Sequence, residues 1–119
     1  MAEGLDTGDM LLKEEIEITP DMNYGELSDV MSKTGAELLI KTIDGLVKGV
    51  ISTVAQNGED ATYASKIDKS ELKIDFSMPA KKIHDLIRGV YPSLSAYGYI
   101  ETAKGRKMLK IASSSYTVK

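Results

Sequence analysis

The stretch SMPAKKIHDLIRGVYP, residues 77–92, carries the clearest helix pattern in the sequence. Its apolar side chains recur every three or four positions, which puts them on one face of a helix: Ile83, Leu86, Ile87 and Val90. Ser77 is placed to cap this helix, Pro79 suits its first turn, and Gly89 with Pro92 suits its end. The stretch therefore predicts an amphipathic helix over residues 79–90.

The residues that follow predict a β-hairpin. The segment AYGYIETAKGRKMLKIASSSYTV, residues 96–118, holds two strand-like runs around a turn at Lys104-Gly105. Tyr97 and Tyr99 alternate in the first run, so both side chains face one side of the strand. They suit stacking on unpaired bases, but burial in a β core is the more usual role of such tyrosines.

The first 49 residues predict a strand followed by a helix. From Asp9 to Ile18 apolar and charged residues largely alternate, which indicates a half-buried strand from Met10 to Ile18. Asn23 and Glu26 have the spacing of a capping box. Apolar residues then follow at helical spacing toward Gly49, and Gly35 inside this pattern marks a kink or a change of axis.

Between these parts, residues 50–76 predict a linker. Its composition is mixed and polar, with a turn signal at Asn57-Gly58 and a short extended piece near residues 72–76. Residues 1–49 and 77–119 then form two structured parts. A lone strand exposes its edge and a lone hairpin is marginally stable, so both parts look incomplete and are expected to self-associate through unpaired strands.

Composition excludes several classes of protein. The 119 residues contain no cysteine and one histidine, His84, so a disulfide, a histidine-based metal centre or a His-dependent triad within the chain is not expected. His84 falls among polar helix positions and is interpreted as a partly exposed surface residue. With no apolar run long enough to span a bilayer and no basic-then-apolar leader, the sequence predicts a soluble, cytoplasmic protein.

The formal net charge of −3 hides a strong asymmetry along the chain. Residues 1–65 carry thirteen acidic side chains against four lysines, whereas residues 81–119 carry eight basic side chains against two acidic ones. A basic C-terminal part favours an anionic partner such as nucleic acid, and an unevenly charged solvated surface is an equal alternative.

Four stretches in this order resemble methionyl-tRNA formyltransferase, from the end of its catalytic domain through a linker into its C-terminal domain: GLDTGDMLL, NYGELSDVMSKTGAELLIKTIDGL, QNGEDATYASKI and KIDFSMPAKKIHDLIRGVYPS. The resemblance covers nearly the whole chain but only a central-to-late part of the family's length. It implies an α+β fragment: a terminal strand and helix of an α/β formyltransferase domain (1–49), a linker (50–76), and a helix with the first strands of an incomplete OB-like β-barrel (77–119).

The resemblance also implies a catalytic residue. In this family the aspartate of the Leu-Asp-x-Gly turn acts with an upstream asparagine and histidine, and the matching residue here is Asp6, with Asp9 a less probable neighbour. The reaction moves a formyl group from formyl-tetrahydrofolate to the amine of initiator Met-tRNA. It needs oxyanion donors and a path for the amine proton. Without the resemblance, Asp6 would be interpreted as a loop carboxylate that caps a turn.

The tRNA partner is likewise implied by similarity. Lys66 matches a linker lysine near the tRNA end, and the remaining candidates for phosphate contacts are Lys69, Lys73, Arg88, Lys104, Arg106, Lys107 and Lys110. Lys81 and Asp85 are better explained as an i,i+4 helix pair. The chain departs from the family at Phe76, where tryptophan is usual, and at Thr53 and Leu94, where proline is common.

Two functions remain open. The first is a part of methionyl-tRNA formyltransferase, a translation-initiation enzyme, with the isolated chain inactive because the upstream asparagine and histidine are not in it. The second is a free-standing, non-catalytic module that binds RNA weakly or self-associates.

Overall fold

The protein is described by a computed structural model that covers residues 5–117. The described residues divide into two compact units. One unit consists of residues 5–17 and 30–65, and the other of residues 18–29 and 66–117. The long helix α1, Tyr24–Val47, contributes to both.

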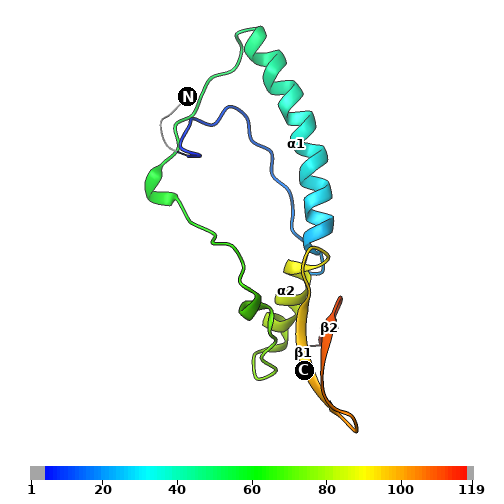
Figure 1. Ribbon diagram of the computed structural model, residues 1–119. Helices are drawn as coiled ribbons and strands as arrows, with labels where there is room; N and C mark the ends of the chain where they lie inside the picture. The colour runs from blue at the N-terminus through cyan, green and yellow to red at the C-terminus, as the bar shows by residue number, and fades with distance from the viewer. Residues whose placement is uncertain (1–4, 118–119) are drawn as a thin grey trace. The chain divides into compact units, whose positions relative to one another are not determined.

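The capping box predicted at the start of α1 is confirmed. The Asn23 backbone N–H donates to the Glu26 carboxylate at 2.9 Å, and the Glu26 N–H donates to Asn23 Oδ1 at 3.0 Å. The helix then runs without a break through Gly35 (Figure 1). Its apolar stripe is largely exposed in the structure, as at Met31, Ile40 and Ile43.

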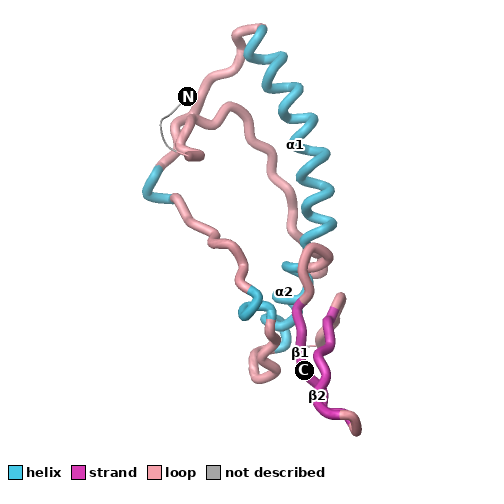
Figure 2. Tube along the Cα trace, viewed as in Figure 1, coloured by secondary structure: helices cyan, strands magenta, loops and turns pink. Residues whose placement is uncertain are grey.

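The strand predicted from Met10 to Ile18 is wrong. This segment is drawn as loop in Figure 2, and its only pairing among the described residues is an isolated antiparallel bridge between Met10 and Val54. Leu12 and Ile18 are 42% and 58% exposed. An alternating sequence forms a strand only where a neighbouring strand supplies a hydrogen-bonding ladder, and past Met10 the described residues supply none.

The second unit holds the hydrophobic core. Helix α2, Ala80–Val90, packs beside a two-stranded antiparallel sheet of β1, Ala96–Thr102, and β2, Gly105–Ile111 (Figure 1). The pairing runs from Ala96 opposite Ile111 to Thr102 opposite Gly105. The core consists of Leu72, Ile74, Ile87, Val90 and Ala96. The predicted hairpin and its turn are therefore confirmed, while the described residues hold two strands and not a closed barrel.

Residues 50–76, predicted as a linker with a short extended piece near residues 72–76, also hold two short 3₁₀ helices, Gly58–Asp60 and Lys69–Leu72. Lys73 forms a parallel bridge to Tyr97, and the Ile74 N–H donates to the Tyr97 carbonyl at 2.8 Å. This pairing brings Leu72 and Ile74 into the core beside α2.

The cap predicted at Ser77 is wrong. Both the backbone N–H and the hydroxyl of Ser77 donate to Asp75 Oδ1, at 2.9 and 2.7 Å. These bonds hold the pKa of Asp75 below its usual range, the hydroxyl bond first and the backbone bond second. The Ser77 hydroxyl therefore bonds to Asp75 and does not cap α2. Helix α2 begins at Ala80, with Pro79 as its N-cap residue.

Candidate functional site

Asp6 lies in a turn with an unusual backbone conformation. Its φ angle is 56°, which makes it the one residue other than glycine with positive φ among those described. Aspartate tolerates this left-handed region better than most residues but still prefers other conformations. The turn is exposed, and the preceding Leu5 is 91% exposed. Packing by Leu5 therefore contributes little to holding the turn.

A side chain from far along the sequence holds this turn. The Gln56 side-chain amide donates to the Asp6 carbonyl at 3.0 Å and to the Gly8 carbonyl at 2.6 Å. Met10 and Val54 exchange two backbone hydrogen bonds, of 2.8 and 2.9 Å, in the same small structure. Sequence reasoning missed Gln56, because its contacts join residues 48 and 50 positions apart.

The Asp6 turn forms one wall of a cavity of about 350 Å³ in the first unit, and Gln56, Asn57 and Asp60 contribute to the other side. Asn57 and Asp60 are engaged with their own loop. The Asn57 side chain accepts from the Glu59 N–H at 3.2 Å and donates to Asp60 Oδ2 at 2.9 Å. The cavity is therefore lined by the turn that carries Asp6 and by carboxylate and amide groups of a loop that is held by its own hydrogen bonds.

The interpretation of His84 as a partly exposed surface residue is wrong. Its side chain is 6% exposed. Nδ1 lies 3.0 Å from the Ser114 hydroxyl, and Nε2 lies 3.3 Å from both the Pro20 carbonyl and Asp21 Oδ1. The available signal was helical spacing, since His84 stands three positions before the buried Ile87 and one after Ile83. His84 therefore ties the segment before α1 and the segment after β2 to α2.

Arg88 makes contacts of the same kind. Its guanidinium donates to the Met22 carbonyl at 2.9 Å and to the Thr19 carbonyl at 3.3 Å, and its Nε donates to Asp85 Oδ1 at 2.7 Å. The side chain is 21% exposed. These contacts turn several of its donors toward the protein, which leaves less of the group for an external phosphate.

Asp85 links two basic side chains on the exposed side of α2. Lys81 Nζ lies 2.6 Å from Asp85 Oδ2, which confirms the predicted i,i+4 pair. Hydrogen bonds from Lys81 first and Arg88 second hold the pKa of Asp85 below its ordinary value of 3.8. The same bond to Asp85 raises the pKa of Lys81.

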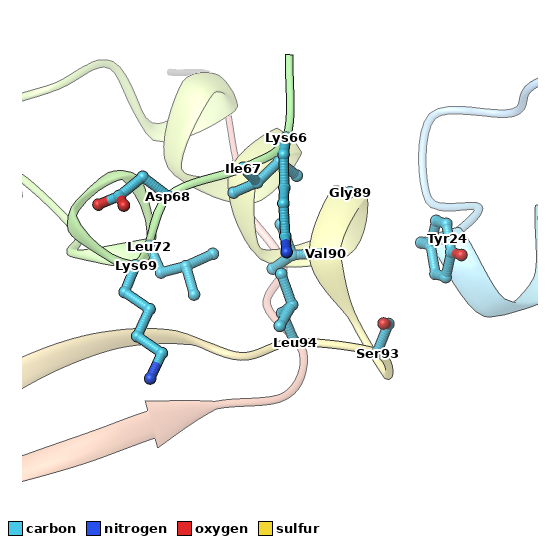
Figure 3. Close-up of a pocket in the computed structure, with 10 residues that line it drawn as sticks. All are labelled: Tyr24, Lys66, Ile67, Asp68, Lys69, Leu72, Gly89, Val90, Ser93 and Leu94. Atoms are coloured by element: carbon cyan, nitrogen blue, oxygen red, sulfur yellow. The ribbon is translucent and has the colours of Figure 1, made fainter. Parts of the chain in front are cut away.

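Two of the candidate lysines line a groove of about 740 Å³ in the second unit. Lys66 extends across Val90 toward Leu94, whereas the ammonium of Lys69 points away from Val90 (Figure 3). Tyr24 lies at the far side of the groove, beyond Ser93 (Figure 3). Lys73, the third candidate in this part of the chain, is exposed and joins β1 only through its backbone bridge.

The other basic candidates lie on the hairpin. Lys104 is in the turn, and Arg106, Lys107 and Lys110 are exposed on β2. Side chains alternate along a strand, so Arg106 and Lys110 share a face and Lys107 lies on the opposite one. Lys110 pairs with Tyr97 across the sheet, and the Arg106 guanidinium carbon lies 4.3 Å from the centre of the Tyr99 ring.

The tyrosines on this face are only partly buried. Tyr97 packs against the core, and Tyr99 is 38% exposed. Their rings meet edge to face, with centroids 5.8 Å apart. Arg106 also lies 3.8 Å from Glu101, a distance that makes a weak ion pair between exposed groups. We call the side chains of Tyr97, Tyr99, Arg106 and Lys110 the basic-aromatic face.

Residues 5–117 hold neither a metal-binding cluster nor a membrane-spanning helix. Within that range, histidine and acidic side chains do not gather in groups of three or more that could bind a metal ion. No helix in that range is both long and apolar enough to cross a membrane.

Comparison with known proteins identifies the class of protein. Residues 66–119 match the family described as formyl transferase, C-terminal domain. The fold resembles the crystal structure of a 4-N formyltransferase from Francisella tularensis with a TM-score of 0.71. That match covers 99% of this chain and 49% of the other at 24% identity. Residues 66–119 therefore belong to the formyl transferase C-terminal domain family.

The sequence relatives narrow this class. The chain is 49% identical to the methionyl-tRNA formyltransferase of Clostridium perfringens over 89 residues, 75% of its own length. It is 42% identical to that of Brucella canis over 115 residues, 97% of its length. The chain spans 29% and 38% of these two relatives. The predicted resemblance to methionyl-tRNA formyltransferase is confirmed.

Proposed function

We propose that this chain is the part of a methionyl-tRNA formyltransferase that carries the catalytic carboxylate, Asp6, and a tRNA-binding surface. The observation that carries the proposal is the identity of 42% over 115 residues with a methionyl-tRNA formyltransferase. The held, left-handed turn at Asp6 supports it, because a catalytic group needs a fixed backbone.

The proposed role of Asp6 is to assist proton transfer from the methionyl amine. The methionyl amine attacks the formyl carbon, a new C–N bond forms, the bond from the formyl carbon to the donor nitrogen breaks, and a proton must leave the amine. A carboxylate at this point orients a neighbouring histidine and passes the proton through a water molecule to the departing nitrogen. In the family resemblance, that histidine and the asparagine that helps to stabilise the oxyanion come from upstream.

A folate-bound formyl group is the donor that fits this chemistry. The formyl group supplies the electrophilic carbon, and the residues in hand fit it only in part. Among the residues that line the cavity, Asp6 offers the hydrogen-bonding group for the reacting end. We assign the donor no other contact within residues 5–117. The asparagine and histidine that the resemblance places upstream are not in the 119-residue chain. Because loss of a single oxyanion donor costs about 10²- to 10³-fold in kcat, this chain alone should lack transferase activity.

For tRNA, the basic-aromatic face is the strongest candidate. Arg106 and Lys110 lie on the same side of the hairpin, and Lys104 stands at its tip. On the opposite face Ala96 is part of the core, and both Ile111 and Tyr97 pack against that core. Lys66 and Lys69 offer a second group of charges beside an apolar groove. Lysine and arginine side chains of this kind contact phosphates and position a nucleic acid without reading its sequence.

Two measurements test the proposal. An antibody raised against the chain should detect a native product far larger than 13.0 kDa. In that product, Asp6→Asn should lower kcat for formylation of Met-tRNA by about 10²- to 10⁴-fold, the usual range for loss of a general acid–base group. A sole product of 13.0 kDa, or full activity of the Asp6→Asn variant, overturns the proposal and favours a free-standing binding module.

A further inference from the structure

The Gln56 side chain donates hydrogen bonds to two carbonyls of the turn that carries Asp6. A carboxamide nitrogen carries two N–H donors, and in this case each has its own acceptor: the carbonyls of Asp6 and Gly8. The two acceptors lie on either side of Thr7. Gln56 therefore fixes the orientation of two peptide groups, including the one that leaves Asp6.

The position of Gln56 follows from the neighbouring bridge. Met10 pairs antiparallel with Val54, and continuing that register by two residues places Gln56 opposite Gly8. The bridge sets the distance between the two segments, and the Gln56 amide then closes over the turn. Asn57, the next residue, caps its own 3₁₀ helix and contacts no residue of the turn in any bond described above.

The turn needs such support. A left-handed conformation is unfavourable for an L-residue, although less so for aspartate. Leu5 and Asp6 are both exposed, so packing does little to compensate. Two side-chain hydrogen bonds are comparable in strength with this cost, and they favour the left-handed turn.

We propose that Gln56 is a positioning residue that sets the direction of the Asp6 carboxylate for formyl transfer; this inference rests on the proposed function of Asp6. Gln56 touches neither reactant. It acts through the backbone of the turn, and misplacing a catalytic group by about 1 Å can cost on the order of 10²-fold in rate.

The experiment uses the full-length formyltransferase that contains this segment. Gln56→Ala removes both donors, and Gln56→Glu keeps the shape but replaces the donors with a carboxylate that repels the two carbonyls. Both variants should lower kcat by about 10- to 100-fold and leave KM for Met-tRNA unchanged. The matched control is Asn23→Ala, which removes another side-chain carboxamide, the one that caps α1, and should keep kcat near the wild-type value.

A double-mutant cycle with Asp6→Asn separates positioning from general support of the fold. If Gln56 acts only through Asp6, Gln56→Ala should cost little further activity in the Asp6→Asn background. Equal costs in both backgrounds, or wild-type kcat in both Gln56 variants, overturn the inference. If Asp6→Asn lowers kcat and the Gln56 variants do not, the proposed function of Asp6 stands and only this inference fails. If Asp6→Asn leaves kcat unchanged, the proposed function and this inference fail together.

A structural measurement on the full-length enzyme covers the case in which a variant folds poorly. Backbone NMR of the wild-type enzyme should show Asp6 in the left-handed conformation, with slow amide exchange at Met10 and Val54, whose N–H groups are hydrogen-bonded. In Gln56→Ala the left-handed shifts should disappear while the resonances of α1 stay in place. Unchanged Asp6 shifts in a folded Gln56→Ala chain overturn the inference without reference to activity.

Discussion

The basic-aromatic face makes a quantitative prediction about salt. Arg106 and Lys110 lie on one face of β2 and Lys107 on the other, so replacing each by glutamine removes the same charge from different sides. The logarithm of the tRNA binding constant falls linearly with the logarithm of the salt concentration, and we call the slope of that line the salt slope. If the acceptor arm of tRNA lies along the basic-aromatic face, Arg106→Gln and Lys110→Gln should each lower the magnitude of the salt slope by roughly 0.9. Lys107→Gln should hardly change it.

The expected difference is large enough to measure. Removal of both phosphate contacts should reduce the slope by roughly 1.8, so between 50 and 200 mM salt the wild type should lose roughly 12-fold more affinity than the double variant. Fluorescence anisotropy with labelled Met-tRNA over that salt range gives the slope directly. The Tm of each variant serves as a check, since all three side chains are exposed and should contribute little to stability.

Three results would contradict the prediction that tRNA lies along the basic-aromatic face. Equal slope changes for Lys107→Gln and Arg106→Gln mean that the hairpin attracts RNA through its net charge and not through one face. No binding by the wild type at 50 mM salt refutes the tRNA surface itself. A fall in affinity without a change in slope for Arg106→Gln indicates instead that its contact with Tyr99 matters more than its charge.

Three further predictions concern stability and association. Gly25→Ala should destabilise the protein by about 1–3 kcal/mol in a denaturant titration, because its Cβ would lie 2.6 Å from Pro92 Cδ, whereas Gly35→Ala has open space and should stabilise α1 by about 0.5–1 kcal/mol. Because the folded state lowers the pKa of Asp85, its contribution is present above the ordinary value of 3.8 and is lost as pH falls through the lowered value; the Tm difference between wild type and Asp85→Asn should therefore narrow below about pH 4. The outer edge of β2, which no described strand covers, should pair with other copies, so light scattering should show dimers or larger species whose fraction rises with concentration, and a monomer at every concentration contradicts this.

Local signals predicted local structure well. The capping box at Asn23 and Glu26, the spacing of Ile83, Ile87 and Val90 and the turn before Gly105 all depend on residues within a few positions of one another. Each of these signals identified an element that the structure contains. The strand predicted from Met10 failed for the complementary reason. Its alternation describes only one side of a pairing, and the partner strand is a property of the whole fold.

The same distinction explains the site. The catalytic role proposed for Asp6 rests on a family resemblance, because an aspartate beside glycine usually caps a turn. Gln56 has no local signal at all, since its two acceptors lie about 50 residues earlier. The burial of His84 has a local signal, which is its helical spacing to Ile83 and Ile87. A histidine at such a position is buried when its ring nitrogens have hydrogen-bonding partners. Here the partners are Ser114, Pro20 and Asp21.

These contacts give one physical account of how short polar segments gain fixed positions in this chain. The segment before α1 is exposed and irregular, yet Arg88 and His84 on α2 bind its carbonyls at Thr19, Pro20 and Met22. The Asp6 turn is held in the same way by Gln56. In both cases a side chain with donors to spare satisfies backbone carbonyls that no strand or helix would satisfy. Fixing these segments therefore depends on single side chains, and substituting one of them should free its segment while α1 and the core of the second unit remain folded.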